Sequence, residues 1–239
     1  MQAVPGNGKT TLLAAKIALL SRNWTSRAQG VCVISHTNAA RHEVEKELLN
    51  HATASAFLSY PHFIGTVTGF VNKYIALPYL RGLGWGIQQI DDDAFEAAAW
   101  RRLGGKRNLL IRTKMKRGAF SNQVRTWVVN LELASDFDCV TDRPPVRLKV
   151  RLLKGQHGPS TDCGRELEEL KAELVNDGLF RFGDMTTLAF KALDAYPSLA
   201  NRLRQRFPLV LLDEAQDTNG PQLKLLDRIF GGGRLPING

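Results

Sequence analysis

Residues near the start of the chain have the types and spacing needed to hold phosphate groups. Residues 3–10 read Ala-Val-Pro-Gly-Asn-Gly-Lys-Thr, the P-loop pattern with alanine in place of the usual first glycine. Gly6 and Gly8 let consecutive backbone N–H groups turn toward phosphate oxygens. Lys9 would bridge the outer phosphates, and Thr10 would offer its hydroxyl to magnesium. The alternative is an ordinary glycine-rich turn before a helix.

A second group of residues that could do chemistry lies far downstream. The apolar residues 209–212 are followed by Asp-Glu-Ala-Gln-Asp-Thr at 213–218. Two adjacent carboxylates at the end of a buried parallel strand form the Walker B arrangement. There Asp213 would hold magnesium through water, and Glu214 would orient or deprotonate the attacking water. Alone this segment reads as an acidic turn, but its pairing with the P-loop pattern favours a nucleotide site.

Strands and helices must bring these two groups to one edge of a sheet. Leu13, Ile17 and Leu20 recur at helical spacing, which predicts a helix whose N-terminus faces the phosphates. Pro221 suits the first turn of the last helix. The predicted elements cover residues 1–20 (turn and helix), 31–35 (strand), 39–49 (helix), 63–68 (turn) and 179–230 (strand and helix). Their alternation predicts an α/β fold, a parallel sheet with helices on both faces.

Residues 76–177 interrupt that alternation and are predicted to be mostly helical. Three aspartates at 91–93 mark the start of a helix that runs through Arg102.

Composition and charge narrow the class of protein. The 239 residues include 32 Lys and Arg against 23 Asp and Glu, a net charge of +9 that suits a polyanionic partner. With 44% hydrophobic residues the chain is neither disordered nor fibrous. No apolar run reaches the roughly 18–20 residues of a membrane span, and no signal region is present, so we expect a cytoplasmic protein. The three cysteines lack metal spacing and do not predict a disulfide framework.

The basic excess is concentrated in the middle of the chain. Residues 101–117 hold eight Lys and Arg and no acidic residue, and a second basic cluster covers residues 143–154. Such clusters bind phosphates without sequence preference, although a solvated surface is the alternative. Trp100 and Trp127 flank the first cluster; they could stack on bases, but burial in a core is favoured.

Four segments resemble motifs of the UvrD/Rep-like superfamily-one DNA helicases. VPGNGKTT is similar to motif I and LLDEAQDTN to motif II. ISHTNAARHEVEKEL, residues 34–48, resembles motif Ia, and RFGDMTTLAFKAL, residues 181–193, resembles the stretch before motif II. The segments occur in the family's order and span nearly the whole chain. The resemblance implies a P-loop NTPase lobe of the RecA-like type (1A) at residues 1–75 and 178–239, incomplete at both ends. A second, helical domain (1B) at residues 76–177 would be inserted into it.

The resemblance also implies roles for single residues. ATP would be bound by Pro5, Gly6, Asn7, Gly8, Lys9, Thr10 and Thr11. Thr10 and Asp213 would hold Mg²⁺, Glu214 would act on the water, and Gln216 would sense the γ-phosphate. Thr37 and Asn38 match motif Ia positions that touch the backbone of single-stranded DNA, although N-capping of the following helix explains them equally well.

Residues 63–70 lie where the family has motif Ib, and the same comparison implies DNA contacts for Thr66 and Thr68. Val67 and Thr68 replace the Phe-His pair of many members. Val67 has no π-face, so base stacking is not expected there. In this segment the chain resembles the helicase-like subunit of Gabija anti-phage systems, which works beside an OLD-type nuclease.

The expected function is that of the N-terminal part of an ATP-dependent DNA helicase or translocase. The resemblance implies 3′ to 5′ movement on single-stranded or junction DNA. It also implies a second RecA-like lobe, an adenine-contacting segment and motif III, none of which this sequence includes. The alternative is a truncated, catalytically inactive relative that binds nucleotide or DNA.

Overall fold

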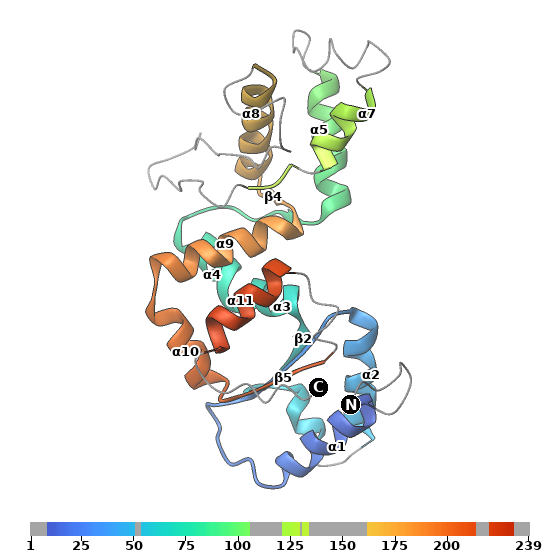
Figure 1. Ribbon diagram of the computed structural model, residues 1–239, viewed down its shortest axis with the longest axis vertical. Helices are drawn as coiled ribbons and strands as arrows, with labels where there is room; N and C mark the ends of the chain where they lie inside the picture. Colours follow the sequence, from blue (N-terminus) through green and yellow to red (C-terminus); the bar gives the residue numbers. More distant parts are fainter. Residues whose placement is uncertain are drawn as a thin grey trace. The chain divides into compact units, whose positions relative to one another are not determined.

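The computed structural model describes residues 9–50, 54–105, 121–129, 131–133, 162–213 and 220–231. The chain divides into two compact units (Figure 1). The first unit combines both ends of the chain, Met1–Tyr74 and Ala192–Gly239, and the second is the stretch between them, Ile75–Lys191. The fold is of the α/β class, with a small parallel sheet and many helices.

Three parallel strands form the sheet of the first unit. The strand order is β2 (Phe63–Thr66), β1 (Val31–Ser35) and β5 (Leu209–Leu212). All five residues of the central strand β1 are buried, as expected for an apolar strand covered on both faces. The predicted strand at 31–35 and the predicted parallel sheet are therefore confirmed.

Helices connect and flank these strands in the first unit. They are α1 (Lys9–Ser21), α2 (Asn38–Leu49), η1 (Ser55–Leu58), α3 (Val67–Val71), the start of η2 (Asn72–Ala76), α10 (Ser198–Arg206) and α11 (Gly220–Phe230). The helices predicted at the start of the chain and at 39–49 are confirmed. The turn predicted at 63–68 is wrong, because the chain continues as strand to Thr66 and the hydroxyl of that residue then caps α3.

The two faces of the sheet have different cores. On one face Val31 and Val33 pack with Ala14 and Ile17 of α1 and with Val44 of α2. On the other face aromatic rings gather around Phe70 of α3, with ring centroids 5.6 Å from Phe63, 5.9 Å from Phe207 and 5.7 Å from Phe230. Alternate residues of each strand therefore point to different cores, which is the strand period of two.

The second unit is mainly helical. Its elements are α4 (Leu77–Gly82), β3 (Gln89–Ile90), α5 (Asp92–Gly105), α7 (Ser121–Val129), α8 (Asp162–Asn176), β4 (Leu179–Phe180) and most of α9 (Phe182–Ala195). Apolar side chains of α5, α7 and α8 share one core. The predicted helix start at 91–93 is confirmed, because the Asp91 carboxylate accepts a hydrogen bond from the Ala94 N–H at 2.7 Å.

A short parallel pair, β3 with β4, lies in this second unit. Residues 179–180 thus pair with β3, and the second compact unit extends to Lys191, whereas the predicted first domain resumes at residue 178. Gly178 leads α8 into β4 with a φ of 77°, a conformation that glycine adopts readily.

Candidate nucleotide and nucleic-acid site

The carboxyl ends of the three parallel strands meet at one edge of the sheet of the first unit. Ser35 at the end of β1 is in register with Thr66 at the end of β2. The backbone N–H of Asp213 donates to the Ile34 carbonyl at 2.8 Å and so continues the ladder beyond β5. Thr66, Ser35 and Asp213 therefore form a row across this edge, which we call the edge row.

The edge row lies on the face that α1 covers. Val33 is in register with Ile64 and with Leu211, and all three pack in the α1–α2 core. Residues two positions further along each strand share that face because side chains alternate. The side chains of the edge row are thus on the same face as α1, the helix that begins within the P-loop pattern.

The position of the C-terminal end of α1 shows in which direction this helix runs along the sheet. Trp24, just after α1, packs edge-on against His62 with ring centroids 5.7 Å apart. His62 directly precedes β2, so α1 ends near the amino edge of the sheet. Because α1 packs along the sheet through Ala14 and Ile17, it begins toward the carboxyl edge.

Most of the predicted nucleotide site lies outside the described residues. This applies to Pro5, Gly6, Asn7, Gly8, Glu214 and Gln216. Lys9, Thr10 and Thr11 form the first turn of α1. Asp213 is half-buried at the end of β5. The structure thus describes the start of the helix and the end of the strand that the two predicted motifs require.

Ser35 carries an unusual side chain for a fully buried position. Its exposed fraction is 0%, and its hydroxyl oxygen has no hydrogen-bond partner among the residues that the structure describes. The ring atom Nδ1 of the next residue, His36, is also buried and has no partner among these residues. Buried polar atoms are nearly always paired, so such atoms at one strand end need an explanation. Sequence reasoning did not select either residue.

The predicted DNA-contacting residues lie at two helix starts. The Thr37 hydroxyl accepts a hydrogen bond from the Ala40 N–H at 3.1 Å and caps α2, which confirms the capping interpretation. Thr66 caps α3 in the same way through the Gly69 N–H, also at 3.1 Å. Capping uses a lone pair of each hydroxyl and leaves its hydrogen able to donate.

The remaining two predicted DNA contacts also belong to these helix starts. Asn38 is the first residue of α2 and is exposed. Thr68 of α3 accepts a hydrogen bond from the Gln222 side chain at 3.4 Å. Gln222 lies in the first turn of α11, so this contact joins the helix after the motif II segment to the helix after β2. Val67 is buried, which agrees with the expectation that it does not stack on bases.

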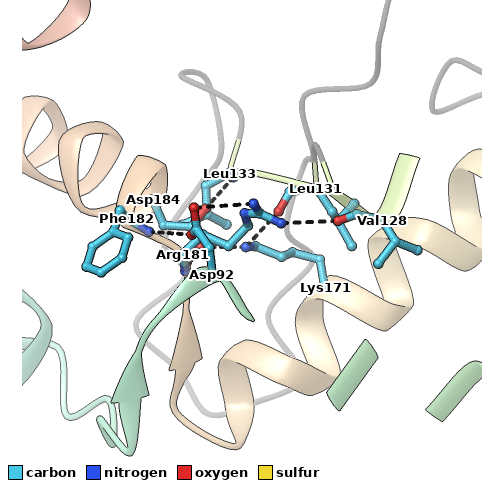
Figure 2. Close-up of polar contacts among 8 residues, drawn as sticks. All are labelled: Asp92, Val128, Leu131, Leu133, Lys171, Arg181, Phe182 and Asp184. Carbon is cyan, nitrogen blue, oxygen red and sulfur yellow. Dashed lines mark hydrogen bonds and ion pairs between the residues drawn. The ribbon is translucent and has the colours of Figure 1, made fainter. Parts of the chain in front are cut away.

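A buried ion pair in the second unit was missed by sequence reasoning. Lys171 of α8 and Asp184 of α9 are both 0% exposed, and Nζ of Lys171 lies 2.5 Å from the Asp184 carboxylate (Figure 2). Asp184 also accepts hydrogen bonds from the N–H groups of Leu133 and Arg181, each at 2.8 Å. Lys171 donates to the Leu131 carbonyl at 3.1 Å. Burial lowers the pKa of Lys171, and the Asp184 carboxylate opposes this change.

Arg181 extends this cluster toward α5 and α7. Its guanidinium donates to the Val128 carbonyl at 3.3 Å and lies 3.4 Å from the Asp92 carboxylate. Asp92 in turn accepts from the Phe182 N–H at 3.1 Å (Figure 2). One signal could have revealed the cluster: Lys171 lies among Leu167, Leu170 and Leu174 on the apolar stripe of α8, where a lysine requires a buried partner.

The predicted basic clusters are described only in part. Residues 106–117 and 143–154 lie outside the described residues. Arg101 is exposed, whereas Arg102 forms ion pairs with Glu173 of α8 and with Asp177, the residue after that helix. Trp127 is 7% exposed, so the burial favoured for it is confirmed. Trp100 packs against the same core and is partly buried.

In the part of the chain that the structure describes, no helix is long and apolar enough to cross a membrane. Among these same residues, no three His, Cys, Asp or Glu side chains gather as metal ligands would.

Several known proteins are similar to this chain in sequence. ATP-dependent DNA helicase UvrD1 of Mycobacterium leprae (strain TN) is 24% identical over 235 residues, which are 95% of this chain and 28% of that protein. DNA helicase II of Haemophilus influenzae (strain ATCC 51907 / DSM 11121 / KW20 / Rd) is 24% identical over 236 residues, 95% of this chain and 29% of that protein. An ATP-dependent helicase/nuclease protein of Streptococcus sanguinis (strain SK36) is 36% identical over 66 residues, 28% of this chain and 5% of that protein.

The chain thus spans less than a third of the length of these relatives. The UvrD/REP helicase N-terminal domain family matches it over residues 1–237. In relatives of this family the N-terminal domain is of the RecA-like type, in keeping with the small parallel sheet. Because the match covers nearly all of its sequence, the chain belongs to the UvrD/REP helicase N-terminal domain family.

Proposed function

We propose that this chain is the nucleotide-binding N-terminal part of an ATP-dependent DNA helicase that couples ATP hydrolysis to movement on single-stranded DNA. The observation that carries the proposal is the edge row, in which Asp213 directly follows β5 of the parallel sheet on the face covered by α1. Ligands of open α/β sheets bind at the carboxyl ends of the strands. Both long relatives are named as DNA helicases, and the Mycobacterium leprae protein as ATP-dependent, which does not favour the alternative of an inactive relative.

The residues present suit magnesium and a nucleoside triphosphate. Asp213 offers carboxylate oxygens, the ligand type that Mg²⁺ prefers, and the buried unpaired hydroxyl of Ser35 lies beside it. Thr10 would complete the metal site, and Lys9 would neutralise the outer phosphates. Magnesium would supply charge neutralisation at the phosphates. The start of α1 favours anions because its N–H groups and dipole point toward them.

The other members of the site have proposed roles that follow the motifs. Pro5, Gly6, Asn7, Gly8 and Thr11 would shape the loop around the phosphates. Glu214 would orient the attacking water or take its proton, and Gln216 would respond to the γ-phosphate. The chain's own residues would therefore bind the phosphates, orient the attacking water and accept its proton.

DNA would be held by its backbone at the starts of α2 and α3. Thr37 and Asn38 are exposed at the first of these helix starts, and Thr66 and Thr68 lie at the second. Hydroxyl and amide groups at helix starts hold phosphates and position the strand without reading bases. Movement with 3′ to 5′ polarity, single-stranded or junction DNA as substrate, and a second RecA-like lobe closing on the nucleotide belong to the same proposal.

The second unit is proposed to be the inserted 1B domain. Both of its ends join the first unit, which is the arrangement that an insertion requires. A nuclease partner of the OLD type remains a further prediction, for which the words helicase/nuclease in the name of the Streptococcus sanguinis relative give only loose support.

The test is ATP hydrolysis by the chain with and without single-stranded DNA. We expect DNA to raise the turnover rate, and we expect Lys9→Ala to lower it by about 100-fold or more, since a phosphate-bridging cation is lost. Lys16→Ala removes the same charge further along α1 and should leave turnover unchanged. Turnover that survives Lys9→Ala would refute the proposed site. Absence of turnover at every DNA concentration, with nucleotide binding retained, would instead identify a binding protein.

A further inference from the structure

The buried hydroxyl of Ser35 has no role in the predicted motifs, although it occupies the centre of the edge row. Asp213 lies on one side of it and Thr66 on the other. The Thr66 hydroxyl is already engaged as the cap of α3. Within the edge row, Ser35 is the residue that is fully buried and unpaired, so the folded protein carries an unfavourable free energy that a bound ligand could remove.

The position of Ser35 matches the water shell of a magnesium ion beside Asp213. Both side chains share the face of the sheet that α1 covers. Adjacent strands are about 4.8 Å apart, a span that one water bridges with two hydrogen bonds of about 2.8 Å. Protein-bound magnesium keeps several of its waters, and these waters need acceptors.

We propose that Ser35 is a positioning residue for the magnesium–nucleotide complex. Its hydroxyl accepts a hydrogen bond from a magnesium-bound water when the complex binds beside Asp213. Nucleotide binding thereby gains a contact with β1. This strand lies between β5, which Asp213 follows, and β2, which ends at Thr66. The inference rests on the proposed nucleotide site and adds a residue to it.

The variant Ser35→Ala separates this role from a structural one. Removing an unpaired buried hydroxyl leaves no group without its partner, so the melting temperature of the ligand-free chain should stay the same or rise. The affinity for a fluorescent ATP analogue in magnesium should fall by about 3–10-fold, the loss of one neutral hydrogen bond. In EDTA the affinity of variant and parent should be equal. Ser35→Thr keeps the hydroxyl and should retain the magnesium-dependent affinity.

Ser59→Ala is the matched control. It removes a hydroxyl that donates to the Ala56 carbonyl at 3.0 Å in the same unit, and it should leave nucleotide affinity unchanged. Ser35→Cys, which keeps the volume but bonds weakly, gives a second variant that should behave as Ser35→Ala does.

Several results would overturn the inference. A lower melting temperature of the ligand-free Ser35→Ala chain would show that the hydroxyl is structural. An affinity loss of equal size in magnesium and in EDTA would exclude the magnesium shell, and weaker nucleotide-free DNA binding would assign the hydroxyl to DNA. If the parent chain shows magnesium-dependent affinity and Ser35→Ala has the same affinity, the proposed role of Ser35 is refuted while the proposed nucleotide site stands. A parent chain without magnesium-dependent binding would refute the proposed function and this inference together.

Discussion

Replacing Lys171 by methionine should strongly destabilise the second unit, because it leaves the buried Asp184 carboxylate without its ammonium partner. Both side chains are 0% exposed, so water cannot replace the lost contact. Removing one member of a buried ion pair typically costs about 3–5 kcal/mol. Asp184 keeps two backbone N–H donors in Lys171→Met, which places this variant toward the lower end of that range.

Asp184→Ala should be the more damaging change. It leaves the ammonium unpaired and also removes the acceptor of the Leu133 and Arg181 N–H groups. Each orphaned buried donor adds about 1–3 kcal/mol to the loss of the pair. The total, about 5–11 kcal/mol, is comparable with the whole stability of a domain. The double variant Lys171→Met/Asp184→Ala should cost about 2–3 kcal/mol less than the sum of the two single changes.

Denaturation by urea followed by tryptophan fluorescence measures this effect. Trp85, Trp100 and Trp127 lie in the second unit, whereas Trp24 lies in the first. A Trp24→Phe background therefore makes the signal specific to the second unit. The free energy of unfolding comes from the midpoint and slope of the transition.

The exposed ion pair between Arg165 and Asp162 on α8 provides a matched control. Its side chains are 59% and 64% exposed, so Arg165→Met should change stability by less than about 1 kcal/mol. The reasoning is refuted if Lys171→Met is as stable as the parent chain, or if the double variant costs the full sum of the single changes.

Three further predictions concern other parts of the fold. His62 accepts a hydrogen bond from the Val31 N–H at 3.0 Å, and burial together with the nearby Arg206 lowers the pKa of His62 from 6.5. Its contribution to stability is therefore complete above pH 6.5 and is lost as the pH falls through the lowered pKa. Thermal unfolding at pH 7.5 and 5.5 should show this loss for the parent chain but not for His62→Asn, which keeps an acceptor. Gly178→Ala should destabilise the second unit by more than about 1 kcal/mol in urea unfolding, because φ is 77° and Cβ would lie 2.6 Å from the Gln88 nitrogen; equal stability would contradict the clash. Thr37→Val should remove the α2 cap and cost about 1 kcal/mol in the same assay, and no change would mean that the cap does not contribute.

Local patterns in the sequence predicted several elements of the first unit, although the segment that forms β2 was predicted as a turn. The apolar run at 31–35 predicted β1, and the threonine before Asn38 predicted the start of α2. These features depend on neighbouring residues, because strand alternation and helix capping act over a few positions. The spacing of glycine, lysine and paired aspartate and glutamate predicted a nucleotide site for the same reason, since each motif is contiguous.

Other features depend on residues that are distant in sequence. Nothing in the two residues of β4 indicates that they pair with β3 and not with the three-stranded sheet. The chain before motif II reads as an amphipathic helix, but the carboxylate of Asp184 acquires its role only where Lys171 and the backbone of residues 131–133 surround it.

What the sequence by itself determined is therefore the family, several strands and helices of the first unit, and the residue types that could bind a nucleotide. Only the tertiary structure decided which polar groups are buried, which of them are paired, and that Ser35 lies unpaired beside Asp213. The physical reason is that motif chemistry is local, whereas desolvation and hydrogen-bond pairing depend on every segment packed around a group.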